Sequence, residues 1–156
     1  KFNGRDAAIF VSKMFEIDVS RRSQQPFVIF NQQKTHQDND IMKVQTFIEE
    51  NYNGKLSIQA LADSVAMSKR SFIRKFKQAT SNTPLEYIQR VKIEAAKKQF
   101  ESQLVNVNEV MYEVGYNDPK AFRDIFKRHT GLSPNDYRTR YHRVINQPFS
   151  QRAVVN

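Results

Sequence analysis

The chain has 156 residues, a formal net charge of +9 and no cysteine. This length suits one domain or two small ones, and the lack of cysteine excludes disulfides, a thiol nucleophile and cysteine-bound zinc. The positive charge favours nucleic acid as a partner, with an anionic membrane surface second. No segment resembles a signal peptide, and no apolar run reaches the roughly 18 residues of a membrane span. We therefore expect a cytoplasmic protein that binds no membrane.

The N-terminal part of the chain differs from the rest. Residues 1–20 show helical apolar spacing followed by a short alternation typical of a strand, and the chain begins with Lys1 rather than Met. Residues 24–40 are polar apart from the apolar stretch 27–30, which predicts a linker with one anchored segment. We expect residues 1–35 to be a remnant of a longer protein, with a helix and a short extended segment.

The remaining chain predicts an all-α fold, because its apolar period is near 3.6 and its Gly and Pro residues stand at helix ends. A first helix is predicted from about Asp40 to Tyr52, followed by the stop signals Asn53 and Gly54. Further helix starts are predicted at Ser57, Ser68, Thr83 with Pro84, Asn106, Asp118 with Pro119, and Ser133 with Pro134. The starts at Thr83 and Asn106 also have Glu three residues later, which predicts capping boxes.

Residues 58–87 and 107–137 are two copies of one pattern. The first part matches at an offset of 49 residues, pairing Ile58, Leu61, Val65, Ala66 and Met67 with Val107, Val110, Val114, Gly115 and Tyr116. After one inserted residue the offset is 50, pairing Phe72, Phe76, Thr80, Pro84 and Tyr87 with Phe122, Phe126, Thr130, Pro134 and Tyr137. A solenoid needs about three or more repeats. Two copies therefore favour a pair of helix-turn-helix motifs.

In a helix-turn-helix the second helix lies in the major groove of DNA. The second helices predicted here, residues 69–80 and 119–129, each place two phenylalanines on one side and polar residues on the other. The candidate DNA contacts are Lys69, Arg70, Ile73, Arg74 and Lys77 in the first copy, and Lys120, Arg123, Asp124 and Lys127 in the second. Arginine and lysine can donate to guanine or phosphate, and Ile73 can touch a thymine methyl. Asp124 can accept from a cytosine amino group or repel phosphate.

The two copies differ in charge. Five basic residues and no acidic one lie between Asp63 and Glu86, whereas the second copy contains Asp118 and Asp124. We expect the first copy to bind phosphate more strongly. The backbone N–H groups at the helix starts near Thr83 and Ser133 are further candidates for phosphate contacts.

A long helix is predicted from Pro84 to about Ser102. Its roughly 19 residues span about 28 Å at 1.5 Å per residue, close to the roughly 34 Å of one turn of B-DNA. A single chain can then contact two adjacent major-groove segments. The slight shortfall suggests that the motifs tilt or that the DNA bends.

Other interpretations are open. A basic helix face is often only a solvated face, and helix caps are structural first. The main alternative is a non-specific basic helical module that binds any nucleic acid or anionic lipid. His36 lies two residues before Asp38, a weak metal signal, while His129 and His142 have no candidate ligands nearby. Without a phosphate loop or nucleophile–base motif, we expect no enzyme, no cofactor and no metal.

Over about residues 40–141 the chain resembles the DNA-binding domain of the AraC/XylS family of bacterial transcription regulators. The resemblance rests on "SIQALADSVAMSKRSFIRKFKQATSNTPLEYI", "RVKIEAAKKQF" and "VGYNDPKAFRDIFKRHTGLSPNDYR". It implies a seven-helix domain over residues 36–141, with a C-terminal tail at 142–156, and places base contacts at the basic candidates named above. It also implies a transcription activator with RNA polymerase as a partner. The chain departs from the family at Met111, where a small residue is usual, and at Asp124.

The stretch "GRDAAIFVSKMFEIDVSRRSQQPF", with "HQDNDI" after it, resembles the end of an amidotransferase-like (ThiJ/PfpI-type) sensor domain found in one subgroup of the family. This resemblance implies that most of the sensor domain, including any inducer site, is absent from these 156 residues. The expected oligomeric state is a monomer or a weak homodimer.

Overall fold

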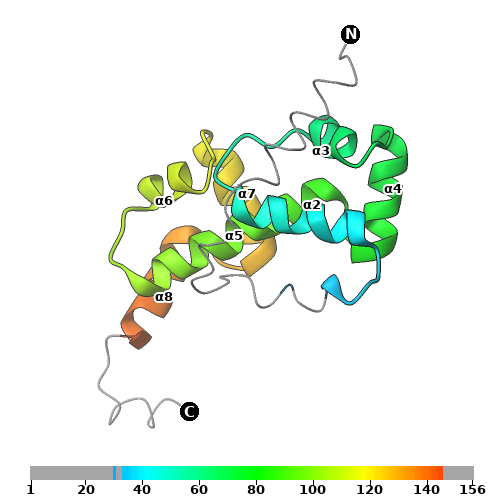
Figure 1. The fold of residues 1–156 in the computed structure, drawn as a ribbon. Helices are drawn as coiled ribbons and strands as arrows, with labels where there is room; N and C mark the ends of the chain where they lie inside the picture. Colours follow the sequence, from blue (N-terminus) through cyan, green and yellow to red (C-terminus); the bar gives the residue numbers. More distant parts are fainter. Residues whose placement is uncertain (1–29, 31–32, 146–156) are drawn as a thin grey trace. The chain divides into compact units, whose positions relative to one another are not determined.

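The computed structural model describes residues 30 and 33–145, and the regular secondary structure of this part is entirely helical (Figure 1). The helices are α2 (Asn39–Glu50), α3 (Ile58–Ser64), α4 (Lys69–Thr80), α5 (Pro84–Ser102), α6 (Val107–Glu113), α7 (Pro119–Thr130) and α8 (Pro134–Ile145). The prediction of an all-α fold with seven helices is confirmed for the described residues. The helix and extended segment predicted near the N-terminus lie outside them.

The described residues form two compact units, one ending at Ile88 and the other beginning at Gln89, so the boundary falls inside α5. The described part of the first unit contains α2, α3, α4 and the start of α5. The second unit contains the rest of α5, followed by α6, α7 and α8. Each predicted helix-turn-helix motif therefore lies within one unit, as α3–α4 in the first and α6–α7 in the second.

The core of the first unit lies around α4, which packs against α2 and α3. Phe72 and Phe76 of α4 are fully buried, with ring centroids 5.6 Å apart. Phe76 also meets Tyr87 at 5.5 Å, and Tyr87 meets Phe30 at 5.4 Å. Such aromatic pairs contribute roughly 0.5–1.5 kcal/mol each beyond their burial. The other large apolar side chains of this core are Ile41, Val44, Ile48 and Leu61.

The second unit repeats this core around α7, which packs against α6 and α8. Phe126 lies 5.7 Å from Phe122 and 5.4 Å from Tyr137, measured between ring centroids. Phe100 of α5 lies 5.7 Å from Phe126. Met111, which departs from the family pattern, is 1% exposed and is part of this core. The aromatic positions found by the sequence repeat are therefore the centres of two separate cores.

Side-chain caps start the helices where the sequence predicted them. Ser57, Ser68 and Asp118 each accept a hydrogen bond from a backbone N–H in the first turn of α3, α4 and α7. At the start of α5, the Thr83 hydroxyl accepts from the Glu86 N–H at 3.2 Å, and the Glu86 carboxylate accepts from the Thr83 N–H at 2.7 Å. This arrangement is the predicted capping box.

Two local predictions were wrong. The first helix ends at Glu50 rather than Tyr52, because the side chain of Asn51 bonds to the carbonyl of Phe47 at 2.9 Å and Asn51 caps the helix. At the start of α6, Asn106 is the cap, but its side chain accepts from the N–H of Asn108 at 2.9 Å. The predicted capping box, in which the Asn106 side chain would accept from the N–H of Glu109, is therefore not formed.

Candidate nucleic-acid interface

The turn between α3 and α4 determines the direction of α4 relative to α3. The N–H of Met67 donates to the carbonyl of Ala62, and the N–H of Ala66 donates to the carbonyl of Asp63, both at 3.0 Å. Ala66 has φ of 54°. Paired bonds of this kind around a left-handed residue form a Schellman motif, which ends a helix sharply.

The second motif has the same turn. The N–H of Tyr116 donates to the carbonyl of Met111, and the N–H of Gly115 donates to the carbonyl of Tyr112, both at 2.9 Å. Gly115, with φ of 80°, occupies the place of Ala66. Both motifs thus have the same backbone turn before the helix that a helix-turn-helix places in the major groove, here α4 and α7. We call α4 and α7 the recognition helices.

Recognition helix α4 buries Phe72, Phe76 and Thr80 and turns its opposite side to solvent. All of the predicted contacts on this helix are accessible: Lys69, Arg70, Arg74 and Lys77 are exposed, and Ile73 is half-buried. Residues three and four apart lie on one helix face, so Arg70, Arg74 and Lys77 form one basic stripe. The sequence prediction for the outward face of α4 therefore agrees with its burial pattern.

Recognition helix α7 has the same burial pattern with different chemistry. Its predicted contacts Lys120, Arg123, Asp124 and Lys127 are all exposed. By the repeat, Arg123 stands where α4 has Ile73, and Asp124 stands where α4 has Arg74. The outward faces of the two recognition helices are thus equivalent in position and unequal in charge.

Lys75 is the basic residue of α4 that turns away from this stripe. Its Nζ lies 3.0 Å from a carboxylate oxygen of Asp38 and 3.9 Å from one of Asp40. Burial alone would raise the pKa of Asp38, but the hydrogen bonds from Lys75 and from the N–H of Ile41 lower it overall. Asp38 is also the cap of α2. Lys75 therefore anchors α4 to the start of α2 within the first unit.

Lys92 is a buried lysine at the turn of the second motif. It is 8% exposed, and its Nζ donates to the carbonyl of Gly115 at 3.2 Å and lies 5.2 Å from the ring centroid of Tyr116. Burial lowers the pKa of Lys92 and raises the pKa of Tyr116 to about 12. The lysine binds the two turn residues that precede α7, and so positions this recognition helix.

The hydroxyls of Thr83 and Ser133 are engaged in helix caps. Thr83 Oγ1 bonds to the Glu86 carboxylate at 2.9 Å, and Ser133 Oγ bonds to the Asp136 carboxylate at 2.6 Å. A phosphate at either helix start would therefore meet a carboxylate beside the free backbone N–H groups. Phosphate contact at these two starts stays a prediction.

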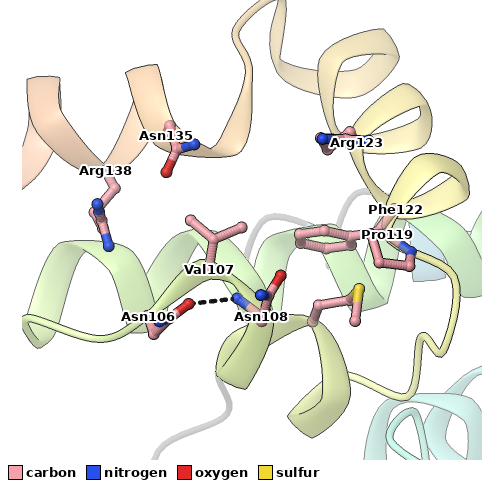
Figure 2. A pocket seen from close by; sticks show the side chains of 9 residues that line it. Asn106, Val107, Asn108, Pro119, Phe122, Arg123, Asn135 and Arg138 are labelled. Atoms are coloured by element: carbon pink, nitrogen blue, oxygen red, sulfur yellow. Dashed lines mark hydrogen bonds between the residues drawn. The ribbon is translucent and has the colours of Figure 1, made fainter.

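A pocket of about 290 Å³ lies in the second unit between the starts of α6, α7 and α8 (Figure 2). Val107 and Phe122 form an apolar part of its wall. Its polar lining consists of Asn106, Asn108, Arg123, Asn135 and Arg138. Figure 2 shows Asn135 and Arg138 projecting from α8 toward the side where Asn106 and Asn108 lie. Arg138 Nη1 also donates to the carbonyl of Val105 at 3.0 Å.

Apart from Arg123, the sequence prediction missed the polar residues of this pocket. One signal was available, because Asn135 and Arg138 stand where the first copy has Leu85 and Ile88. Core packing does not require a polar residue at a position where the other copy has an aliphatic one. Such a difference between the copies therefore indicates a candidate functional residue.

The described residues contain no cluster of three or more His, Asp or Glu side chains that could hold a metal ion. Both ring nitrogens of His36 are engaged, since Nδ1 accepts from the N–H of Asp38 at 3.2 Å and Nε2 lies 2.9 Å from Oε1 of Gln45. Among the described residues, no helix is long and apolar enough to cross a membrane.

Two helical units, each presenting an exposed recognition helix after a tight turn, define a DNA-binding protein of the helix-turn-helix class. The chain belongs to the helix-turn-helix domain family, whose sequence pattern matches residues 61–140. Its fold is that of AraC-type DNA-binding domains. The chain is therefore a helix-turn-helix domain that is similar to the DNA-binding domains of transcription regulators.

Known proteins similar to this chain agree with this assignment. The crystal structure of the DNA-binding domain of AdpA, a global transcriptional factor, in complex with a target DNA has a TM-score of 0.66 and 28% identity, covering 71% of this chain and all of that one. An uncharacterized HTH-type transcriptional regulator of Pseudoalteromonas carrageenovora is 34% identical over 98 residues, which are 63% of this chain and 58% of the relative.

The transcriptional activator RhaS of Salmonella schwarzengrund is 28% identical over 104 residues, which are 67% of this chain. The match covers 37% of RhaS. The chain thus spans only part of the curated relatives it matches.

Proposed function

We propose that this chain recognises a two-part DNA site, with α4 in the major groove at one half-site and α7 in the major groove at the other. The observation that carries this proposal is the repetition of one turn and one burial pattern in both units. Each recognition helix buries two phenylalanines and exposes the opposite side. A helix placed this way can contact base edges with its outward residues.

The two half-sites differ in sequence, because the recognition helices differ at equivalent positions. Arg74 can donate two hydrogen bonds to O6 and N7 of guanine, whereas Asp124 can accept from the amino group of cytosine. Ile73 suits a thymine methyl, and Arg123 in the equivalent place suits guanine or phosphate. Lys69, Arg70, Lys77, Lys120 and Lys127 complete the proposed contacts, with phosphate binding stronger in the first unit. Backbone groups at Thr83 and Ser133 are secondary candidates for phosphate.

Selection from a randomised duplex library, followed by sequencing, tests this function. We expect enrichment of two short, unlike motifs about one helical turn apart. The selected duplex is called the operator below. Strong, salt-dependent binding without enrichment would instead support the alternative of a non-specific basic helical module.

Arg74→Ala tests one assigned contact. Loss of a bidentate arginine–guanine contact should weaken operator binding by about 1–3 kcal/mol and relax the preference at that base pair. Lys75→Ala is the matched control, since Lys75 turns away from the basic stripe and pairs with Asp38 in the first unit. An equal loss on operator and scrambled duplex would make Arg74 a phosphate contact only.

The wider role is also a proposal. The regulator acts as an activator, a role supported by the name of the relative RhaS. The family resemblance supports RNA polymerase as its partner, and we place its action in the cytoplasm. No catalytic role is assigned to the chain. The likeness of residues 4–27 to an amidotransferase-like domain supports an effector-binding sensor as the adjoining part. The DNA-binding domain is proposed to be monomeric or weakly dimeric, which light scattering after size-exclusion chromatography measures.

A further inference from the structure

The polar lining of the pocket in the second unit differs from the equivalent positions of the first unit. The repeat pairs three of its polar residues with aliphatic ones: Arg123 with Ile73, Asn135 with Leu85, and Arg138 with Ile88. The pocket wall provided by Val107 and Phe122, in contrast, is matched by the apolar Ile58 and Phe72. The second unit therefore shares the apolar framework and adds hydrogen-bond donors to it.

The chemistry of the lining favours an anion. No acidic residue lines the pocket. Among the described residues the exposed guanidinium of Arg123 has no hydrogen-bond or ion-pair partner, and Arg138 uses Nη1 for the carbonyl of Val105 and has further N–H donors. The amide of Asn135 adds a donor from α8. Guanidinium and amide groups together suit a phosphate group, whose oxygens accept hydrogen bonds from several directions.

The size of the pocket limits which ligands it can bind. Its volume of about 290 Å³ lies at the lower limit of pockets for small-molecule ligands, roughly 300–1,000 Å³. A phosphate with its adjoining deoxyribose is a smaller ligand than most effectors, and its apolar sugar face can pack on Val107 and Phe122.

The position of the pocket connects it to DNA. Arg123 belongs both to the pocket lining and to the exposed side of α7. In a helix-turn-helix, the first helix crosses the DNA backbone while the second lies in the groove. The cap of α6, Asn106, and its first residues, Val107 and Asn108, line the pocket on the side of this first helix. A backbone strand bordering the groove that holds α7 would therefore run past the pocket.

We propose that this pocket binds one phosphodiester of the DNA strand beside the second half-site, with Asn135, Arg138 and Arg123 as donors. The inference rests on the proposed two-part recognition of DNA and adds a specific backbone contact to it. It gives the second unit, whose recognition helix contains an acidic residue, its own anchor to the phosphate chain.

The experiment uses the full chain and the operator duplex, with single neutral methylphosphonate groups placed in turn at each phosphate around the second half-site. The protein variant is Asn135→Leu, which introduces the residue of the first unit at an exposed position of α8. The matched control is Leu85→Asn, since Leu85 is 56% exposed at the equivalent position of α5. Dissociation constants are measured by fluorescence anisotropy at one salt concentration.

We expect Asn135→Leu to weaken operator binding by about tenfold to a hundredfold, as for the loss of one hydrogen bond to a charged group. At one phosphate, or two adjacent ones, methylphosphonate should weaken wild-type binding but cost the variant markedly less. Leu85→Asn should keep the wild-type response at every position. Equal costs for wild type and Asn135→Leu at all positions would overturn the proposal.

A second measurement separates DNA from a free phosphorylated molecule. Inorganic phosphate is titrated into the DNA-free protein while the side-chain amide signal of Asn135 is followed by NMR. Saturable binding at low millimolar phosphate, combined with no coupled position on DNA, would overturn the DNA assignment. Failure of the proposed function looks different, because wild-type protein would then bind operator and scrambled duplex equally.

Discussion

The phenol of Tyr87 donates a hydrogen bond to Oε1 of Glu49 at 2.6 Å, while Oε2 of the same glutamate accepts from Lys34 at 2.7 Å. Glu49 therefore ties α2 both to α5 and to the segment before α2 in the first unit. In the second unit Tyr137 donates in the same way to Glu101 of α5. The C-terminal half of α5 thus has the role in the second unit that α2 has in the first.

We predict that Tyr87→Phe lowers the free energy of unfolding by about 1–2 kcal/mol, because it removes one hydrogen bond to a carboxylate. The ion pair with Lys34 stays in place. Tyr137→Phe is the matched change, and we expect a loss at least as large, since no cation pairs with Glu101 among the described residues. Urea unfolding measures both, and unchanged midpoints would contradict the prediction.

Gly131 and Ser81 are equivalent caps at the ends of α7 and α4, with φ of 78° and 62°. Nothing lies within 4 Å of a Cβ added at Gly131, so Gly131→Ala introduces backbone strain without a clash. We expect it to destabilise by about 1 kcal/mol. Ser81→Gly should stabilise by less than about 1 kcal/mol, because the greater unfolded-state freedom of glycine offsets part of the relief. Equal stability of Gly131→Ala and wild type would show that an alanine at this left-handed position causes no backbone strain, and would contradict the prediction.

The hydroxyl of Tyr116 is buried and has no hydrogen-bond partner among the described residues. We predict that Tyr116→Phe stabilises the protein by about 1 kcal/mol, because it removes an unsatisfied polar group and keeps the ring that faces Lys92. Tyr112→Phe is the control, since Tyr112 is 60% exposed and its change should leave stability unaltered. A destabilised Tyr116→Phe would show that the hydroxyl does have a partner, such as a bound water.

Alkaline pH should destabilise the fold. Burial raises the pKa of Tyr116 to about 12, whereas a tyrosine in the unfolded chain titrates near 10. The unfolded state then loses its proton first, so stability is fully present below about pH 10 and falls as pH rises toward 12. Burial, followed by the charge of Glu49, also raises the pKa of Tyr87. Denaturant unfolding from pH 9 to 12 should show a smaller decline in Tyr116→Phe than in wild type; identical declines would contradict this.

Lys75 and Lys77 provide a test of which face of α4 meets DNA. Lys77 is exposed on the basic stripe, whereas Lys75 pairs with Asp38 within the first unit. We expect Lys77→Met to reduce the salt dependence of operator binding by about one phosphate contact, and Lys75→Met to leave it nearly unchanged. Lys75→Met should cost no more than about 1 kcal/mol of stability, since its side chain is 40% exposed. If Lys75→Met reduced the salt dependence more than Lys77→Met, the face of α4 that contains Lys75 would be the one that meets DNA, and the proposed interface would be wrong.

Much of the fold was predictable because local chemistry determines it. Cap residues such as Ser57, Ser68 and Asp118 mark helix starts whatever surrounds them, and the phenylalanine spacing identified both cores. The end of α2 was misplaced because Asn51 stops the helix through its own side chain, before the more obvious Asn53 and Gly54.

Features that depend on tertiary contacts could not be predicted in the same way. The correspondence between α2 and α5 was not predicted from the sequence, because it lies at an offset of 52 residues, outside the two repeated motifs, and pairs unlike core residues such as Ile48 and Phe100. The pairing of Lys75 with Asp38 requires two helices to meet. A count of charges along the chain therefore includes Lys75 among the residues expected to bind phosphate, although it forms an ion pair within the first unit. The outward residues of α4 and α7 follow from helical periodicity alone, but their base contacts stay predictions.

Under the proposed two-part recognition, the difference between Arg74 and Asp124 gives the bound protein a direction. A symmetric dimer on a palindrome looks the same from either end of the DNA, but a chain whose two motifs prefer unlike base pairs does not. The proposed binding site would then have two distinguishable ends. If such a site were reversed in front of a gene, the other surfaces of the bound protein would face away from the transcription start. Regulation would then depend on the orientation of the site as well as on its spacing.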